Sequence, residues 1–325
     1  MWGKAVRIIP RVSKQEWQKL DPIAKWLIAT RSAVFLMTTF SVIVGGLLAA
    51  DGRHFSIVKF LLCLTGLVLA HATNNLANDY TDSIRGVDKD NYFRTMYGPQ
   101  ALENGLWTKA KMRAVIAGTG AVAVLCGIIL TFMVGMPVLW LMLAGAFFVL
   151  FYTWPLKLIG LGEPSVILVW GALMVGGTYL VMTGEWSWTV AAIGTIYAIG
   201  PTTVLFGKHT DKLKEDRVKK IHTLPVILGE TRSRMSVIAM LILQPILVTA
   251  FVYAGLLRWP MLIVILGVPA IITAVKVFSK VRPTTRPKDF PAEAWPTYLA
   301  GHAFRANRVT GGLFVLGLLI SLLVK

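Results

Sequence analysis

The feature that most constrains this chain is a series of apolar blocks about twenty residues long, separated by polar or charged segments. A helix of that length crosses a hydrocarbon core of roughly 30 Å. Soluble α/β proteins instead alternate shorter apolar runs with polar ones. The chain is 55% hydrophobic and only 15% charged, whereas soluble domains are about a quarter charged. We therefore predict an all-α integral membrane protein.

Nine blocks have this character, and we expect each to form a transmembrane helix. They are Trp26–Ala50, Ser56–Asp79, Met112–Val134, Pro137–Tyr152, Ser165–Thr183, Trp188–Gly207, Met235–Leu256, Pro260–Phe278 and Val309–Val324. Residues 1–25 precede them, and we expect this segment to lie in the cytoplasm or at the membrane interface. Residues 26–325 then form a single nine-helix domain.

The positions of the Lys and Arg residues test this topology, because positively charged loops favour the cytoplasmic side of a membrane. With the N-terminus in the cytoplasm, 28 of the 33 Lys and Arg residues fall in inner segments and three in outer ones. We therefore expect a multi-pass protein of the plasma membrane with a cytoplasmic N-terminus. The net charge of +17 is explained by these loops, so we expect no nucleic-acid partner.

The end of the second block carries the first group of polar residues. Steps of three and four place these residues on one helical face: His71, Asn74, Asn75, Asn78, Asp79 and Asp82. A charge costs roughly 2.5–3.5 kcal/mol at the bilayer centre, so this stripe needs a cavity, a cation or a partner. A packing seam between helices would explain the asparagines, but not the carboxylates that continue through Asp88 and Asp90. Clustered carboxylate and amide oxygens are ligands suited to Mg²⁺.

A second group of charged residues follows the sixth block. Asp211 and Glu215 are four positions apart, which predicts a shared helical face, and Asp216 comes next. The cations around them are Lys208, His209, Lys212, Arg217, Lys219 and Lys220. Alone, this segment could be an ordinary basic loop. Because both groups follow even-numbered blocks, we expect both on the cytoplasmic side, where two acidic groups with flanking cations can hold a diphosphate through bridging Mg²⁺.

Five runs of residues carry a family resemblance. They are Asn78-Asp79-Tyr80-Thr81-Asp82 with Gly86-Val87-Asp88, Gly98-Pro99-Gln100-Ala101-Leu102, Tyr152-Thr153-Trp154-Pro155-Leu156-Lys157, Gly160-Leu161-Gly162-Glu163, and Asp216-Arg217 with Thr223-Leu224-Pro225-Val226. The first and last resemble the two Asp-rich motifs of the UbiA superfamily of intramembrane prenyltransferases. The other three are similar to its menaquinone-branch members, the 1,4-dihydroxy-2-naphthoate prenyltransferases. The resemblance implies nine helices around a central cavity.

The resemblance also implies transfer of an isoprenyl chain from its diphosphate to an aromatic acceptor, here 1,4-dihydroxy-2-naphthoate, with Mg²⁺ as cofactor. The implied metal ligands are Asn78, Asp79, Asp82, Asp88, Asp211, Glu215 and Asp216. The expected catalytic residues are Asp82, Asp211, Asp216 and Tyr152. The ring of Tyr152 would stabilise an allylic cation, although a tyrosine at the membrane interface would also fit there. The expected diphosphate contacts are Arg94, Lys157, Lys208 and Lys212, and the further candidates are Asn75, Arg31, His209 and Gln100.

The second motif departs from the family's pattern. The family usually places two aspartates four residues apart, but the position four before Asp216 is Lys212. The metal-binding pair is therefore Asp211 with Glu215, or Asp211 with Asp216 after a local change in the helix. Lys208-His209 also stands where menaquinone-branch members tend to have Asn and Arg. These differences concern the acceptor more than the diphosphate chemistry.

Two other functions fit part of this pattern. The same chemistry could act on another acceptor, such as a different quinone ring, a tetrapyrrole or a lipid. A cation-coupled transporter would also carry acidic residues in its spans. Both acidic groups are expected at one face of the membrane rather than at its midplane, and we see no inverted repeat in the sequence, which favours the enzyme. We expect membrane lipid around the protein and infer no obligate protein partner.

Overall fold

The structure, a computed structural model, describes residues 1–87 and 99–324. Within these residues all regular structure is helical. In chain order the helices are α1 (Trp2–Ala5), α2 (Lys14–Lys19), α3 (Pro22–Ala29), η1 (Ser32–Val34), α4 (Phe35–Asp51), α5 (Ile57–Ile84), α7 (Lys109–Val134), α8 (Met136–Phe151), η2 (Leu156–Ile159), α9 (Gly162–Ile167), η3 (Leu168–Gly176), α10 (Gly177–Thr183), α11 (Trp188–Asp211), α12 (Leu213–Val218), α13 (Leu224–Leu228), α14 (Glu230–Tyr253), η4 (Trp259–Gly267), α15 (Val268–Phe278) and α16 (Tyr298–Leu323).

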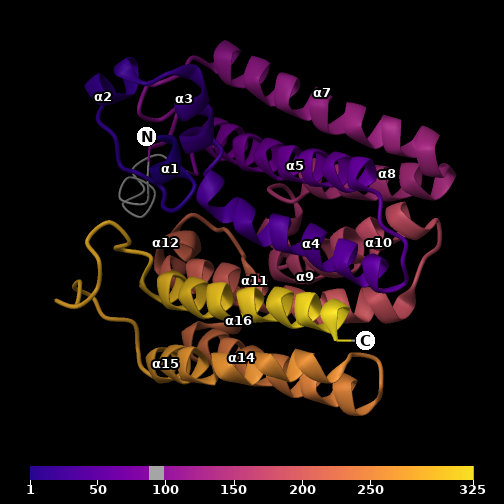
Figure 1. The fold of residues 1–325 in the computed structure, drawn as a ribbon. Coiled ribbons are helices and arrows are strands. Elements are labelled where there is room, and N and C mark those ends of the chain that lie inside the picture. Colours follow the sequence, from indigo (N-terminus) through magenta and orange to yellow (C-terminus); the bar gives the residue numbers. More distant parts are fainter. Residues whose placement is uncertain (88–98, 325) are drawn as a thin grey trace.

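The long helices lie side by side in a bundle (Figure 1). Helices α5, α7 and α8 form one side of it, α14 and α15 form the opposite side, and α4, α11 and α16 lie between them. The middle helices share a buried apolar cluster that includes Val44, Tyr197 and Phe314. Helix α11 is the most enclosed of the long helices, since it packs against α14, α16 and η3.

The predicted all-α membrane fold is confirmed. In the part of the chain that the structure describes, eight helical segments are long and apolar enough to cross a membrane. The fourth predicted span corresponds to α8, which has 16 residues. At 1.5 Å per residue it is about 24 Å long, shorter than a typical hydrocarbon core. The count of nine spanning helices therefore stays a prediction, as does the cytoplasmic position of the N-terminus.

The first predicted span is not one continuous helix, contrary to the prediction for Trp26–Ala50. Helix α3 ends at Ala29, and the chain turns at Arg31 before α4 begins at Phe35. Arg31 has a φ of 57°, in the left-handed region, which costs a non-glycine residue about 1–2 kcal/mol. Its buried guanidinium forms an ion pair with Asp79 of α5. The turn thus directs a cation toward α5.

The fifth predicted span contains a π-helical segment, η3, between α9 and α10. Such segments are rare and often occur near functional sites. Two glycines allow η3 to approach α11 closely, because a methyl group on Gly171 would lie 2.9 Å from the Cα of Thr195. The opposite Gly194 is equally confined, since its methyl group would lie 2.6 Å from the Cβ of Val175. The small residues therefore fix the distance between these two helices.

The N-terminal segment packs onto the ends of α5 and α7 (Figure 1). Ala5 and Trp17 are buried in one apolar cluster with Leu76 of α5 and Met112 of α7. Helix α2 begins with a capping box, in which Ser13 and Glu16 bond each other's backbone N–H groups. The predicted division between residues 1–25 and 26–325 stays a prediction.

Candidate active site

A cavity of about 510 Å³ lies between α5, α7, α8, η3 and α11. Its volume falls in the range of small-molecule binding sites. Most of its wall is apolar, with Leu67, Leu130, Leu141 and Met174 among the lining side chains. Along α5 the lining runs from Leu62 to Asp82. Those twenty positions correspond to about 30 Å of helix. The cavity is therefore long and changes from apolar to polar along its length.

The polar end of the cavity gathers nine of the predicted site residues. They are Arg31, Asn75, Asn78, Asp82, Tyr152, Lys157, Lys208, His209 and Lys212. They come from α5, α11, and three connecting segments that follow α3, α8 and α11. The structure thus brings the first and second polar groups to one site.

The polar stripe on α5 faces this cavity, as its helical spacing predicts. Asn74, Asn75, Asn78 and Asp82 all line the wall. Asn75 also donates a hydrogen bond from its side chain to the carbonyl of Thr30, at 2.8 Å. This contact ties α5 to the turn that precedes α4.

Asp82 forms a buried ion pair with Lys157. The ammonium Nζ lies 3.0 Å from Oδ1 and 2.9 Å from Oδ2 of the carboxylate. Both residues are less than 10% exposed. The pair joins the end of α5 to η2, the short helix that follows α8 and Tyr152. A charged pair held out of water at a cavity wall is a feature typical of functional sites.

The charged side chains on the described part of the wall are mainly cationic. Arg31, Lys157, Lys208 and Lys212 line the wall, and Asp82 is the one acidic residue among the described residues that line it. Arg31 and Lys212 are paired with Asp79 and Asp216, which do not line the wall. A cluster of cationic side chains stabilises a bound anion, and it does so more strongly in a water-poor cavity than at a protein surface. The cavity therefore suits a molecule with an anionic head and a long apolar tail.

The second motif differs from its predicted geometry. Helix α11 ends at Asp211, and α12 begins at Leu213 after a turn at Lys212. The expectation that Asp211 and Glu215 share a helical face is therefore wrong. Lys212 points its ammonium at Asp216, with Nζ 3.0 Å from Oδ1. The second oxygen of Asp216, Oδ2, is buried and has no hydrogen-bond partner among the described residues.

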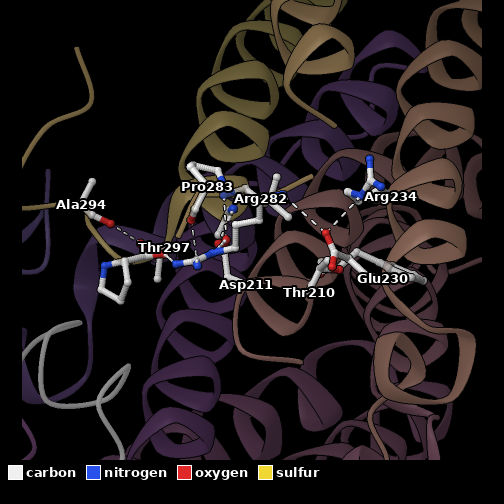
Figure 2. A network of polar contacts seen from close by, with 12 residues as sticks. Thr210, Asp211, Glu230, Arg234, Arg282, Pro283, Ala294 and Thr297 are labelled. Atoms are coloured by element: carbon white, nitrogen blue, oxygen red, sulfur yellow. Dashed lines mark hydrogen bonds and ion pairs between the residues drawn. The ribbon is translucent and has the colours of Figure 1, made fainter. Parts of the chain in front are cut away.

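Asp211 lies off the cavity wall and is held by groups far along the chain (Figure 2). Its Oδ1 accepts hydrogen bonds from Arg282 Nε at 2.9 Å and from the backbone N–H of Leu299 at 3.0 Å. Its Oδ2 accepts from the N–H of Ala300, also at 3.0 Å. These N–H groups belong to the first turn of α16, where backbone donors lack partners within the helix. Asp211 thus anchors the start of α16 to the end of α11.

Arg282 extends this network across the same end of the bundle (Figure 2). Its guanidinium donates to the carbonyl of Pro296 at 2.7 Å. Its backbone N–H lies 3.4 Å from Oε1 of Glu230, which also pairs with Arg234 at 3.5 Å. The network connects α11, α14 and α16 with the segment between α15 and α16.

The remaining predicted residues that the structure describes do not line the cavity. Asp79 is paired with Arg31, Glu215 is half-buried on α12, and Gln100 is buried after the undescribed segment. Asp88 and Arg94 lie outside the described residues.

Two residues with clear structural roles were not among the predicted site residues. Glu163, at the start of α9, is 1% exposed and forms a hydrogen bond with His209. Its signal in the sequence is its place in the run Gly160-Leu161-Gly162-Glu163, which carries part of the family resemblance and ends two residues before a long apolar block. Arg282 gives no comparable signal, because it lies 71 positions from Asp211 in an otherwise basic segment.

The donors at the polar end fit Mg²⁺. Asn78 and Asp82 line the cavity and carry an amide and a carboxylate oxygen. Asp216 does not line the cavity, but it pairs with Lys212 of the wall and has a second, buried oxygen without a partner among the described residues. These are the hard ligands that Mg²⁺ prefers, and substrate phosphates commonly complete its coordination. The described residues alone contain no group of three or more His, Cys, Asp or Glu side chains that could hold a metal. A complete site would thus need the substrate or a further residue.

Comparison with known proteins agrees with this architecture. The UbiA prenyltransferase family matches residues 38–296. A 1,4-dihydroxy-2-naphthoate octaprenyltransferase of Escherichia coli (strain K12) is 29% identical over 231 residues, which cover 67% of this chain and 72% of that protein. A protein of the same name from Mycobacterium tuberculosis is 30% identical over 221 residues, covering 65% of this chain and 72% of its own.

Solved structures share the fold. A UbiA homologue from Aeropyrum pernix K1 gives a TM-score of 0.65 at 18% identity, with 87% of this chain and 97% of that chain covered. A UbiA homologue from Archaeoglobus fulgidus, bound to DMAPP and Mg²⁺, gives 0.56 at 17% identity, covering 93% and 100%. The family match extends over most of the chain, including both polar groups on α5 and α11. The chain belongs to the UbiA prenyltransferase family.

Proposed function

We propose that this protein transfers an isoprenyl chain from its diphosphate to an aromatic acceptor, with 1,4-dihydroxy-2-naphthoate as the first choice. The observation that carries the proposal is a long apolar cavity that ends in the buried Asp82–Lys157 pair and three further cations. An isoprenyl diphosphate has the matching form, an apolar chain with an anionic head. We place the site at the cytoplasmic side of the plasma membrane, because the loops at this end are strongly basic.

The cations at the polar end are the groups that would bind the diphosphate. Lys157 and Lys208 would contact phosphate oxygens through charge-assisted hydrogen bonds. Asn78, Asp82 and Asp216 would hold Mg²⁺, with Asp88 as a further ligand. When bound, Mg²⁺ neutralises charge that develops on the leaving diphosphate.

The apolar wall would protect the carbocation that forms when the diphosphate leaves. Water is the competing nucleophile, and an apolar cavity wall limits its access to the carbocation. Tyr152 lines the cavity and directly follows α8, a few residues before Lys157 of η2. Its ring can stabilise a desolvated cation by up to about 2 kcal/mol.

The choice of acceptor is supported by the names of the relatives rather than by the geometry. Two relatives of about 30% identity act on 1,4-dihydroxy-2-naphthoate by name. Family membership also favours an enzyme over a cation-coupled transporter.

The test is an in vitro panel with purified protein in detergent. Geranylgeranyl diphosphate and longer diphosphates are mixed with 1,4-dihydroxy-2-naphthoate, other phenolic rings and polar lipids, and products are identified by mass spectrometry. We expect a prenylated 1,4-naphthalenediol, formed with release of diphosphate and of the carboxylate as CO₂, and only when Mg²⁺ is present. Product from a different acceptor alone would change the substrate and keep the reaction. Absence of diphosphate release with every acceptor would refute the proposal.

A further inference from the structure

Glu163 and His209 form a buried pair beside the polar end of the cavity. Nδ1 of His209 lies 2.7 Å from Oε1 of Glu163. The residues are 46 positions apart, on α9 and α11, and they are 1% and 2% exposed. His209 also lines the cavity. One edge of the imidazole is therefore fixed by Glu163, while the same ring forms part of the wall.

Two polar atoms of this pair have no hydrogen-bond partner among the described residues, and one of them belongs to a residue of the cavity wall. His209 makes its hydrogen bond through Nδ1, and Nε2 has none with the described residues. Oε2 of Glu163 is buried and likewise has no partner among them. A buried polar atom without a partner costs roughly 1–3 kcal/mol. Because His209 lines the cavity and Glu163 does not, a ligand in the cavity that forms a hydrogen bond with Nε2 of His209 would be favoured at this place.

The hydrogen bond to Glu163 decides what the cavity-facing nitrogen can do. A carboxylate only accepts hydrogen bonds, so it holds the ring proton on Nδ1. In the neutral imidazole, Nε2 then carries a lone pair and accepts hydrogen bonds. The pair thus favours a group that donates a hydrogen bond, such as a free hydroxyl. It offers no hydrogen-bond donor to a diphosphate, whose oxygens are acceptors.

The surroundings of the pair suit an aromatic alcohol. The hydroxyl of Tyr152 would lie 3.8 Å from a methyl group on Gly162, the residue next to Glu163. Tyr152 is therefore close to the same part of the wall. The lysines on the wall, by contrast, are the groups that attract phosphate.

We propose that Glu163 and His209 form a subsite that binds a hydroxyl group of the prenyl acceptor. The inference rests on the proposed prenyl transfer and adds the place where the acceptor is held. Nε2 of His209 accepts a hydrogen bond from the hydroxyl, and Glu163 fixes the ring in the tautomer that this requires. The hydroxyl then sets the orientation of the aromatic ring relative to the diphosphate.

Two substitutions of His209 separate this role from a purely structural one. In His209→Asn the amide takes the place of Nδ1, so it keeps the bond to Glu163 and loses the atom that contacts the acceptor. In His209→Gln the amide reaches the place of Nε2 and can still meet the hydroxyl. We expect KM for 1,4-dihydroxy-2-naphthoate to rise about tenfold in the Asn variant and less in the Gln variant. KM for geranylgeranyl diphosphate should change less than the acceptor KM in both.

A structural role predicts the reverse order, because only the Asn variant retains the buried bond to Glu163. That order would overturn the proposal. The matched control is His222→Asn, a substitution of an exposed histidine on the segment after α12. We expect it to leave both KM values unchanged.

A second measurement uses the wild-type protein and does not depend on the variants folding. The dissociation constants of 1,4-dihydroxy-2-naphthoate and of its mono-O-methyl ethers are compared by calorimetry. We expect at least one ether to bind about tenfold more weakly, because it cannot donate from the position that the pair contacts. Equal binding of all three compounds would overturn the subsite. If the wild-type protein binds an isoprenyl diphosphate and releases diphosphate from it but binds no acceptor of this class, the proposed subsite is wrong while the proposed prenyl transfer still stands. If it turns over no isoprenyl diphosphate, the proposed function fails first.

Discussion

Lys157 and Asp82, 75 positions apart in the chain, meet as a buried ion pair at the polar end of the cavity. Nζ contacts both carboxylate oxygens, at 3.0 and 2.9 Å. The pair therefore fixes the end of α5 against the segment after α8 and places both charges where an anionic head would bind. Removing one partner of a buried pair leaves the other charge uncompensated.

The first prediction separates folding from chemistry at this pair. Asp82→Asn is expected to abolish prenyl transfer and to destabilise the protein by about 3–5 kcal/mol, because Lys157 stays charged and buried. The double variant Asp82→Asn with Lys157→Met removes both charges, so much of the stability should return. Transfer should not return. The measurements are thermal unfolding in detergent and product formation by mass spectrometry. A folded double variant with wild-type turnover would contradict the site.

The second prediction concerns Asp211, which belongs to the sequence motif but anchors α16. Asp211→Asn weakens the contacts to Arg282 and to the first turn of α16. We expect a loss of about 1.5–3 kcal/mol in the free energy of unfolding. The Mg²⁺ concentration for half-maximal transfer should not change in the folded protein.

Asp216→Asn is the matched comparison for Asp211→Asn. It removes a carboxylate whose Oδ2 is buried without a partner, so we expect the half-saturating Mg²⁺ concentration to rise. The rate of prenyl transfer is measured against Mg²⁺ concentration for both variants, and the comparison shows which of the two aspartates binds the metal. If Asp211→Asn raises that concentration and Asp216→Asn does not, the assignment of the two aspartates is reversed.

The stripe on α5 shows what the sequence could predict about this site. Asn75, Asn78 and Asp82 belong to one uninterrupted helix, so spacing alone places them on one face. The long apolar blocks likewise predict the membrane fold. Both inferences depend on local periodicity, which a regular helix preserves.

The second motif shows where such inference fails. The spacing of Asp211 and Glu215 predicts a shared face only if the helix continues, and α11 ends at Asp211. The partner of Asp211 is Arg282, 71 positions away, which no local pattern identifies. The break at Arg31 has the same origin, because Asp79 lies 48 positions further on. Contacts between segments that are distant in the sequence determine where these side chains lie and which partners they bind.

The third prediction uses the left-handed conformation of Arg31. Arg31→Ala and Arg31→Gly both remove the ion pair with Asp79, so both should lower stability. The glycine variant should be more stable than the alanine variant by about 0.5–1 kcal/mol, since the left-handed cost of 1–2 kcal/mol exceeds the entropy that glycine loses on folding. Parallel unfolding curves of the two variants test this. Equal stability, or a more stable alanine variant, would argue against the positive φ.

The fourth prediction tests where the isoprenyl chain lies. Gly145 on α8 lines the cavity, and a methyl group there would meet no atom within 4 Å. It lies seven residues from Tyr152 in the chain, or about 10 Å along the helix. Gly145→Leu should therefore fill the path of a long chain without disturbing the fold. We expect geranylgeranyl diphosphate to lose about tenfold or more in kcat/KM relative to geranyl diphosphate.

Gly118→Leu on α7 is the control for this substitution, because Gly118 is also unconfined but lies on the exposed face away from the cavity. It adds the same side chain to a neighbouring membrane helix, so any general effect of leucine on the bundle appears in both variants. The ratio of the two kcat/KM values should stay at the wild-type level in Gly118→Leu and fall only in Gly145→Leu. A wild-type ratio in Gly145→Leu would show that the chain leaves the diphosphate site by another route, because a chain extending along α8 cannot pass a side chain placed in its path.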